Sequence, residues 1–265
     1  MQQVKIKSIK KIERKDRYDL TVNSTKNFFA NGILIHNTSA IISNCLVKKK
    51  LKLKDMIAKF FGANIVTTEY DYIYASRRVV KNGKFKSKDH FYGEDIWKKA
   101  SNVFRGRLNQ GETVYFEIVG YIDTEKFIQK NFDYGCKPGE YKIAVYRITY
   151  TGPDKVVYEY PWGSMKERCK ELGVEHVREF YYGRAKDLYP ELSTEQHWHQ
   201  NFIDNLRRDY LEKDCTICIH KVPSEGIVLR RECKEIDVYK LKSEKFLALD
   251  SKMKDEGNED MEDVN

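Results

Sequence analysis

Alternating apolar and polar residues dominate the start of the chain. Val4–Ile12 follows this period-two pattern, which is typical of a half-buried strand, and Tyr18–Val22 is a second expected strand. Two short apolar segments, Phe28–Ala30 and Ile33–Ile35, follow. Asn31-Gly32 separates the last two segments and suits the type I′ turn of a two-residue hairpin. We therefore expect residues 1–37 to form a small all-β unit, which is too short to bury a core alone and needs a partner.

The rest of the chain mixes strand and helix patterns. Strand patterns occur at 65–75, Val114–Val119, Lys142–Thr149, Thr216–Lys221, Gly226–Arg230 and Val238–Leu241. Helical spacing occurs over Asp95–Asn109 and over most of 164–212, and Lys81–Lys84 has the residues of a turn. No internal repeat is evident. These patterns predict an α+β domain over residues 38–250, followed by a disordered acidic tail at 251–265.

Composition supports a folded protein of this kind. Hydrophobic residues make up 41% and aromatic residues 13% of the 265 residues, which is too much for a disordered chain. No apolar run approaches the roughly 18 to 20 residues of a membrane span, and the basic N-terminus lacks the apolar stretch of a signal peptide. We therefore expect a soluble protein of the cytoplasm.

The net charge of +8 is unevenly distributed along the chain. Residues 1–37 hold eight basic and three acidic residues, which gives +5, and 243–265 hold three basic and eight acidic residues, which gives −5. The segment between them carries the remaining +8. A basic body suits a polyanionic partner such as nucleic acid, because phosphate contacts release counterions. A basic surface that only keeps the protein soluble is the alternative.

Six cysteines are scattered along the chain, and only Cys215-Thr-Ile-Cys218 has the spacing of a zinc site. No second clear pair accompanies it, although His220 and Cys233 could contribute ligands. The segment also has the alternation of a strand. We therefore favour reduced structural thiols over a metal site.

The residues around position 37 have the chemistry needed to break and re-form a peptide bond. An asparagine amide can attack its own backbone carbonyl, which forms a succinimide and cleaves the chain after Asn37. The leaving group needs a proton donor, which His36 is placed to provide, and the developing oxyanion needs stabilisation. The hydroxyl of Thr38 can act as the nucleophile of an acyl transfer. These three residues alone are equally compatible with the end of an ordinary hairpin.

The longer string resembles the last two sequence blocks of inteins, because YDLTV, a short loop, NFFANGILIHN and a hydroxyl residue occur at that family's spacing. The resemblance implies that Asn37 cyclises with the help of His36, and that Thr38 is the first extein residue and accepts the ester. It also implies that Asp19 organises this step. Lys26 departs from the pattern, since many inteins have a histidine before the Asn-Phe pair.

Only 36 residues precede Asn37, which is too few for the N-terminal block of an intein. The resemblance therefore implies that residues 1–37 are the C-terminal half of a split intein. Such a fragment splices in trans with a separate N-terminal chain.

A second set of residues, in the region after Asn37, suggests a nucleotide site. Glu117 lies inside an apolar strand, and Glu225 opens the string Glu-Gly-Ile-Val. Acids in such strands are costly to bury unless they bind a metal, a ribose hydroxyl or a cation. Lys240 and Lys242 are two apart and share one face of a strand, as in a phosphate clamp. Taken separately, Glu117 is also compatible with an edge residue, Glu225 with a turn that enters a strand, and the lysine pair with a solvated strand face.

In this order and spacing, these strings resemble motifs III, IV and V of the covalent nucleotidyltransferases, and are closest to the RNA-ligase branch. The resemblance covers most of residues 38–245 and implies an antiparallel-sheet-rich, ATP-grasp-like adenylation domain without its N-terminal portion. It implies that Glu117 contacts the ribose or a metal, that Glu225 assists Mg²⁺ or Mn²⁺, and that Lys240 and Lys242 hold the phosphates of ATP.

Two further strings extend the resemblance. Val145-Tyr146-Arg147-Ile148 is similar to the motif whose aromatic ring stacks on adenine, which makes Tyr146 the candidate. Ala75-Ser76-Arg77 resembles the segment whose arginine contacts the nucleotide or the 5′-phosphate. We favour Arg77 over Arg78 for this role.

The motif Lys-x-(His or Asp)-Gly, whose lysine forms the lysyl-adenylate in this superfamily, is not found in the chain. In RNA ligases it is commonly followed by Thr and small residues, and Thr38-Ser39-Ala40 directly follows the expected splice point. We therefore expect the separate N-terminal chain to carry the nucleophilic lysine. Splicing would complete an ATP- and Mg²⁺-dependent ligase that adenylates itself, then an RNA 5′-phosphate, and finally joins that end to a 3′-hydroxyl.

Three alternatives remain open at this stage. An ATP-dependent DNA ligase or a capping enzyme carries the same motifs, but each generally adds an OB-fold after motif V, and only about 23 residues follow Lys242. A non-catalytic, basic RNA-binding protein is the third. It leaves Glu117, Glu225 and the two lysines without a role.

Overall fold

The computed structural model describes residues 8–12, 17–21, 29–30, 33–34, 39–76, 80–81, 95–196, 198–233 and 236–255. The chain divides into two units, Met1–His36 and Asn37–Asn265. The mixture of sheet and helices confirms an α+β class. No described helix is long and apolar enough to cross a membrane.

The first unit contains two antiparallel strand pairs. β1 (Ser8–Ile12) pairs with β2 (Arg17–Thr21), and this register places Asp19 opposite Lys10. β3 (Phe29–Ala30) pairs with β4 (Ile33–Leu34). Each of the four expected strands therefore has a described strand within or overlapping its range. Asn31-Gly32, the expected turn, lies outside the described residues.

A seven-stranded sheet forms the centre of the second unit. Its strands run in the order β10-β9-β8-β5-β6-β7, and β11 pairs in parallel with β9. All other pairs in this sheet are antiparallel. The bounds are β5 (Ser39–Lys48), β6 (Thr68–Ser76), β7 (Val80–Lys81), β8 (Glu112–Gly120), β9 (Tyr141–Thr151), β10 (Val157–Glu159) and β11 (Glu175–His176).

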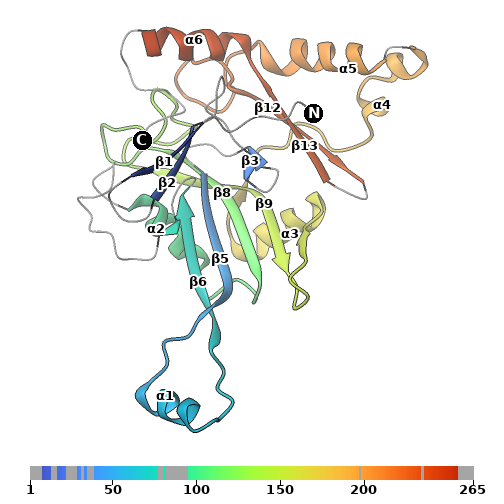
Figure 1. Ribbon diagram of the computed structural model, residues 1–265. Coiled ribbons are helices and arrows are strands. Elements are labelled where there is room, and N and C mark those ends of the chain that lie inside the picture. The colour runs from blue at the N-terminus through green and yellow to red at the C-terminus, as the bar shows by residue number, and fades with distance from the viewer. Residues whose placement is uncertain are drawn as a thin grey trace. The chain divides into compact units, whose positions relative to one another are not determined.

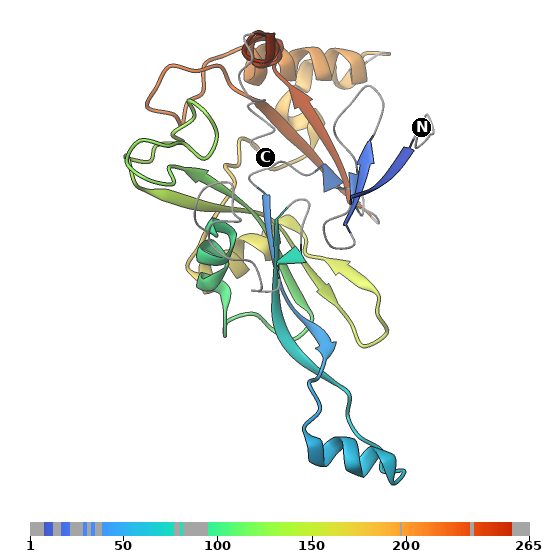
Figure 2. The ribbon, with the colours of Figure 1, turned by 60° about the vertical axis from the view of Figure 1, so that its left-hand side comes forward.

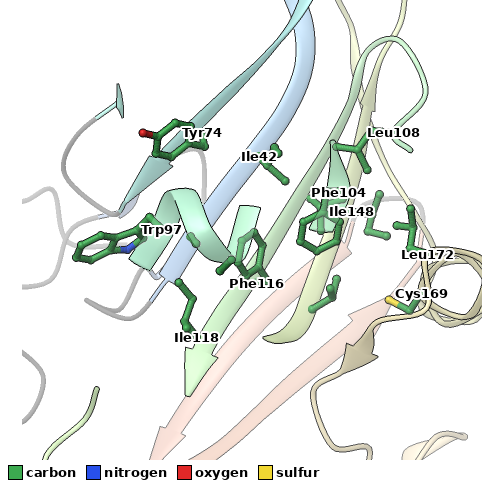
Figure 3. Close-up of a cluster of buried hydrophobic side chains, with 14 of the residues drawn as sticks. Ile42, Tyr74, Trp97, Phe104, Leu108, Phe116, Ile118, Ile148, Cys169 and Leu172 are labelled. Atoms are coloured by element: carbon green, nitrogen blue, oxygen red, sulfur yellow. The ribbon is translucent and has the colours of Figure 1, made fainter. Parts of the chain in front are cut away.

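Helices cover one face of this sheet. α2 (Ile96–Ser101), η2 (Asn102–Phe104) and α3 (Trp162–Leu172) supply buried side chains that pack on β5, β8 and β9. Figure 3 shows this core, in which Phe104 and Phe116 lie with ring centroids 5.0 Å apart. Alternate residues of β8 supply the sheet side of the core, because Val114, Phe116 and Ile118 are buried. The side chains between these residues therefore point away from this core.

The helix expected over Asp95–Asn109 is shorter in the structure. The Asp95 side chain accepts a hydrogen bond from Lys98 N at 3.0 Å and so caps the start of α2. The α-helix ends at Ser101, and Gly106 then adopts a φ of +75°, which a continuing helix does not allow.

A second layer consists of a hairpin and its helices (Figure 1). β12 (Gly226–Glu232) and β13 (Ile236–Lys242) pair over their whole length, confirming both expected strands. One face of the hairpin, which includes Ile227, Leu229 and Leu241, packs on a cluster of helical side chains. The helical elements of this layer are α4 (Ala185–Leu188), η3 (Pro190–Thr194), α5 (Trp198–Leu206), η4 (Arg207–Leu211) and α6 (Glu244–Asp255).

Two expectations near the C-terminus are wrong. α6 continues to Asp255, so the first residues of the expected disordered tail are helical. Thr216–Lys221 is bent and irregular instead of a strand. The backbone donors there bind side chains: Cys218 N donates to Cys215 Sγ at 3.4 Å, and Ile219 N and His220 N donate to Asp133. These backbone N–H groups are therefore not available to pair with another strand.

Candidate functional site

The candidate site begins on the sheet face opposite the helices. Glu117 projects from β8 on that face, since its neighbours Phe116 and Ile118 both point into the core. β8 lies between β5 and β9, so Glu117 is not an edge residue. Its partner across the strands is Ser39, whose hydroxyl donates a hydrogen bond to Glu117 Oε1 at 2.5 Å. The first strand after the expected splice point therefore directly contacts this carboxylate.

Tyr146 reaches the same face because of an irregularity in β9. Tyr115 pairs with Arg147, whereas the next residue, Phe116, pairs with Val145, so Tyr146 is the extra residue of a β-bulge. Bulges redirect side chains and often lie next to functional sites. The ring of Tyr146 is half-buried and its hydroxyl is fully buried. The bulge thus accounts for the placement of the residue expected to stack on adenine.

The hydroxyl of Tyr146 lies in a polar but crowded environment. Burial and the negative charge of Glu117 raise the pKa of this phenol, an effect that the Ser39 hydroxyl partly offsets. Among the described residues, no group offers this hydroxyl a hydrogen bond of good geometry. The phenol stays protonated at physiological pH, and the partly exposed ring is the surface that Tyr146 offers to a ligand.

Arg147 connects the sheet to the second layer. Its Nε donates to Glu159 Oε2 at 2.6 Å, and Arg230 on β12 donates to Glu159 Oε1 at 2.6 Å. Glu159 therefore joins strands of both layers through two charge-assisted bonds. The Arg147 guanidinium also lies 5.0 Å from the ring centroid of Tyr115. This network fixes the hairpin relative to the face that carries Glu117.

The hairpin brings Glu225 and Lys240 together. Gly226 pairs with Lys242 and Val228 with Lys240, so the two lysines lie on the same face of β13, as expected. Lys240 Nζ lies 2.7 Å from Glu225 Oε1, and both side chains are mostly buried. The motifs that the sequence places 15 residues apart thus become one ion pair.

Gly226 permits the close contact of these two strands. A Cβ built at this position would lie 2.2 Å from the backbone oxygen of Leu241 and 3.0 Å from Lys242 Cα. Its φ of +155° is also unusual for residues with a side chain. The glycine of the Glu-Gly-Ile-Val string is therefore required by backbone packing.

Lys242 and Val228 lie on the same face of the hairpin as Lys240. Lys242 Nζ lies 5.7 Å from the ring centroid of Phe246 at the start of α6, a contact that the sequence does not predict. Val228 shares this face and is 62% exposed, although it is an apolar residue in the middle of a paired strand. An exposed apolar side chain flanked by lysines is a surface on which a planar, anionic ligand could lie.

Tyr134 is the residue of this site that the sequence pattern did not reveal. Its hydroxyl lies 2.9 Å from Gln129 Oε1 and 3.5 Å from Glu225 Oε2. Burial raises the pKa of this phenol strongly, and the charges of Glu225 and Glu117 raise it further. Tyr134 thus lies beside Glu225, one of the two candidate carboxylates. A lone tyrosine in a loop gives no periodic signal, so only the fold identifies it.

Asp133 anchors the loop that carries Tyr134. This fully buried carboxylate accepts hydrogen bonds from Gly135 N, Ile219 N and His220 N, and from His220 Nδ1 at 2.6 Å. Burial alone would raise its pKa, but the hydrogen bonds outweigh burial and lower the pKa to about 2. The ionised carboxylate therefore ties the Tyr134 loop to the bent segment at 215–220.

The Cys215-Cys218 pair belongs to this segment. All six cysteines are free thiols, and a hydrogen bond from the Cys218 thiol lowers the pKa of Cys215 to about 6. Within the described ranges, no three His, Cys, Asp or Glu side chains gather closely enough to hold a metal ion. Glu117 and Glu225 would therefore need oxygen donors from a ligand, as magnesium commonly receives from phosphates.

The other predicted site residues cannot be placed. His36, Asn37, Thr38, Arg77 and Arg78 lie outside the described residues, and Asp19 is described only in its backbone. The structure therefore brings Glu225 and Lys240 together, with Lys242 on the same strand face as Lys240, and places Glu117 beside Ser39 on the central sheet.

The comparisons with known proteins add no family. No protein-family model matches the chain, and no curated protein matches it with significant similarity.

Proposed function

We propose that this chain, after splicing in trans to an N-terminal partner, is an ATP-dependent RNA ligase. In this proposal residues 1–37 carry out the C-terminal splicing steps and are released. The remainder joins a 5′-phosphate to a 3′-hydroxyl through a lysyl-adenylate and an adenylated RNA end.

The observation that carries the proposal is the polar cluster around Glu225. The Tyr134 hydroxyl lies 3.5 Å from Glu225 Oε2, and Glu117 lies on the central sheet, where the Ser39 hydroxyl donates to it. Lys240 adds a cation at 2.7 Å from Glu225. Two carboxylates, a lysine and a half-buried tyrosine are the kinds of group that bind a nucleoside triphosphate.

Each residue has a role in this proposal that follows from its chemistry. Tyr146 presents its ring to the adenine, since its hydroxyl is buried and its face is partly open. Glu117, held by Ser39, accepts a hydrogen bond from a ribose hydroxyl or provides an oxygen to the metal. Lys240 and Lys242 neutralise the triphosphate. Arg77 remains the candidate for contacting the nucleotide or the 5′-phosphate.

The residues present fit a magnesium or manganese ion bound together with ATP. Glu117 and Glu225 offer carboxylate oxygens, which are the ligands that these hard cations prefer. When bound, the ion would neutralise charge on the phosphates as pyrophosphate leaves. Lys240 would share this work, because it is already held beside Glu225.

The nucleophilic lysine is proposed to lie on the partner chain, in a Lys-x-His-Gly motif whose glycine immediately precedes Thr38 in the spliced product. Ser39, one residue further on, donates its hydroxyl to Glu117. A lysine placed just upstream of β5 would therefore enter the site beside Glu117. In this scheme His36 assists Asn37 cyclisation and Thr38 accepts the acyl group.

Sealing assays on the spliced product test the proposal. The product is expected to join nicked or single-stranded RNA ends bearing a 5′-phosphate, with AMP released in proportion. Glu117→Gln should reduce sealing at least about 100-fold, since a site carboxylate is lost. Glu175→Gln, an exposed acid on β11, is the matched control and should seal normally. Equal activity of both variants would reject the site, and sealing of DNA but not RNA would assign a DNA ligase.

A further inference from the structure

The hairpin formed by β5 and β6 extends beyond the sheet and carries α1 (Leu53–Phe60) at its tip (Figures 1 and 2). We call residues 48–67 the arm. None of the side chains of α1 is buried. The arm is thus an exposed extension of two strands, one of which begins at the candidate site with Ser39.

The base and first turn of the arm are densely basic. Over residues 48–59 there are six lysines and one acid, Asp55, so this segment carries +5. Lys49, Lys50, Lys52 and Lys54 line one depression together with Asp55 and Glu69. A positive charge of this density on so short a segment is a strong attractor for a polyanion.

The tip of the arm exposes apolar and aromatic side chains next to these lysines. Leu53, Met56, Ile57 and Phe60 recur at helical spacing, and Leu53 is 73% and Phe60 86% exposed. Phe61 is 79% exposed and packs edge to face on Phe60, with ring centroids 5.5 Å apart. Two aromatic rings beside a row of lysines provide stacking surfaces as well as charge.

The helix lacks the support that most helices of its length receive. An eight-residue helix is marginal in water by itself, and most helices are stabilised by packing of an apolar face. The apolar side chains of α1 are exposed in the described structure. A bound partner that covers them would therefore also order the arm.

We propose that the arm is a polynucleotide-binding surface that holds RNA at a distance from the ends that are joined. Its charge disfavours a second copy of this chain, whose net charge is +8, and favours a polyanion. β5 joins Ser39 at the site to Lys48 at the base of the arm, a span of roughly 30 Å at 3.3 Å per residue. RNA seated at the site and running along β5 would reach the lysines. This inference rests on the proposed ligase function for its choice of partner.

The test measures RNA binding directly, without ATP and without splicing. The full chain and its variants are titrated with fluorescein-labelled single-stranded RNA of 30 nucleotides, and anisotropy is followed at several salt concentrations. The arm variant carries Lys49→Gln, Lys50→Gln, Lys52→Gln and Lys54→Gln. The matched control replaces four exposed lysines elsewhere in the same unit by glutamine: Lys137, Lys155, Lys186 and Lys213.

The arm variant should bind at least about tenfold more weakly, and its salt dependence should be shallower by roughly 3 in log–log slope, at about 0.7 for each lost phosphate contact. The control variant should bind nearly as the unchanged chain does. Phe60→Ala with Phe61→Ala should weaken binding by at least about fivefold while leaving the salt slope unchanged, because stacking is lost and charge is kept.

An equal loss of RNA affinity in the arm and control variants would overturn the proposal, because RNA binding would then depend on the total positive charge and not on the arm. No loss in the arm variant, or binding of the arm to vesicles of anionic lipid with unchanged RNA binding, would also overturn it. Circular dichroism of each variant checks that the fold is retained. The result is independent of catalysis. If the arm variant keeps normal RNA binding while the spliced protein seals RNA, the arm proposal alone is rejected; if the arm variant loses RNA binding but the spliced protein does not seal, the ligase proposal alone is rejected.

Discussion

Lys240 Nζ lies 2.7 Å from Glu225 Oε1; Lys240 lies on β13, and Glu225 directly precedes β12, the strand paired with it. Both side chains are less than a quarter exposed, at 16% and 21%. An ion pair so placed holds a cation and a carboxylate ready for the phosphates and metal of a nucleotide. Within the proposed ligase, this pair is the half of the site that the hairpin contributes.

Replacing Lys240 separates the structural role of the pair from the proposed catalytic one. Lys240→Met leaves Glu225 charged and partly buried, so it should lower the free energy of unfolding by about 1 to 3 kcal/mol. Adding Glu225→Gln should recover most of that stability, because the unpaired charge is removed. Adenylation of the spliced protein should stay at least about 100-fold below normal in both variants. Denaturant unfolding and label transfer from ATP measure the two effects, and recovery of adenylation in the double variant would contradict the assigned role.

Tyr134→Phe removes the hydroxyl between Gln129 and Glu225 while keeping the packed ring. We expect adenylation to fall by about 3- to 30-fold, with the loss partly overcome at high magnesium concentration, since Glu225 would be less well positioned. The unfolding free energy should change by no more than about 1 kcal/mol. A fall in stability with an unchanged magnesium dependence would assign Tyr134 a purely structural role.

Gly226→Ala should disrupt the hairpin. The added Cβ would lie 2.2 Å from Leu241 O, a backbone atom that cannot move without separating the strands. We expect destabilisation of about 2 kcal/mol or more, measured by denaturant unfolding. Gly163→Ala is the control, because a Cβ there meets nothing within 4 Å and α3 gains helix propensity. Equal stability of the two variants would show that the strands are not packed as described.

The Asp133 carboxylate should make stability sensitive to acid. Its pKa is lowered from 3.8 to about 2, so it contributes stability above pH 4 that is lost as the pH falls towards 2. The protein should therefore exceed Asp133→Asn in unfolding free energy by roughly 1 to 2 kcal/mol at pH 5, and this difference should shrink by pH 2. Thermal unfolding across this range is the measurement. A difference that does not change with pH would show that the charge of Asp133 is not what stabilises the loop.

Much of the fold follows from local sequence pattern. The strand at 112–120 alternates clearly, because one face packs on the core and the other does not, and the strands at 141–151, 226–232 and 236–242 are also evident from their apolar residues. Thr216–Lys221 also alternates, yet Asp133 captures its backbone donors and keeps it bent. That outcome depends on a residue more than 80 positions away, so no local pattern contains it.

Only part of the candidate site could be predicted from the sequence. The chemistry of Glu117, Glu225 and Lys240 stands out because charged residues interrupt apolar strands. The bulge that redirects Tyr146 depends on strand register, and the role of Tyr134 depends on two layers meeting. The sequence pattern predicts no helix in the arm, since eight helical residues give too short a period to separate from the lysine run around them.

The most direct test of the account is transfer of label from α-labelled ATP to protein. This chain is mixed with a partner that carries an intein N-terminal half preceded by Lys-x-His-Gly, and the products are followed by mass spectrometry and autoradiography. The account predicts release of a 37-residue piece, a new bond to Thr38, and label only on the joined protein. It also predicts that Asn37→Ala prevents both joining and labelling. Labelling of this chain alone, or joining by the Asn37→Ala variant, would contradict it.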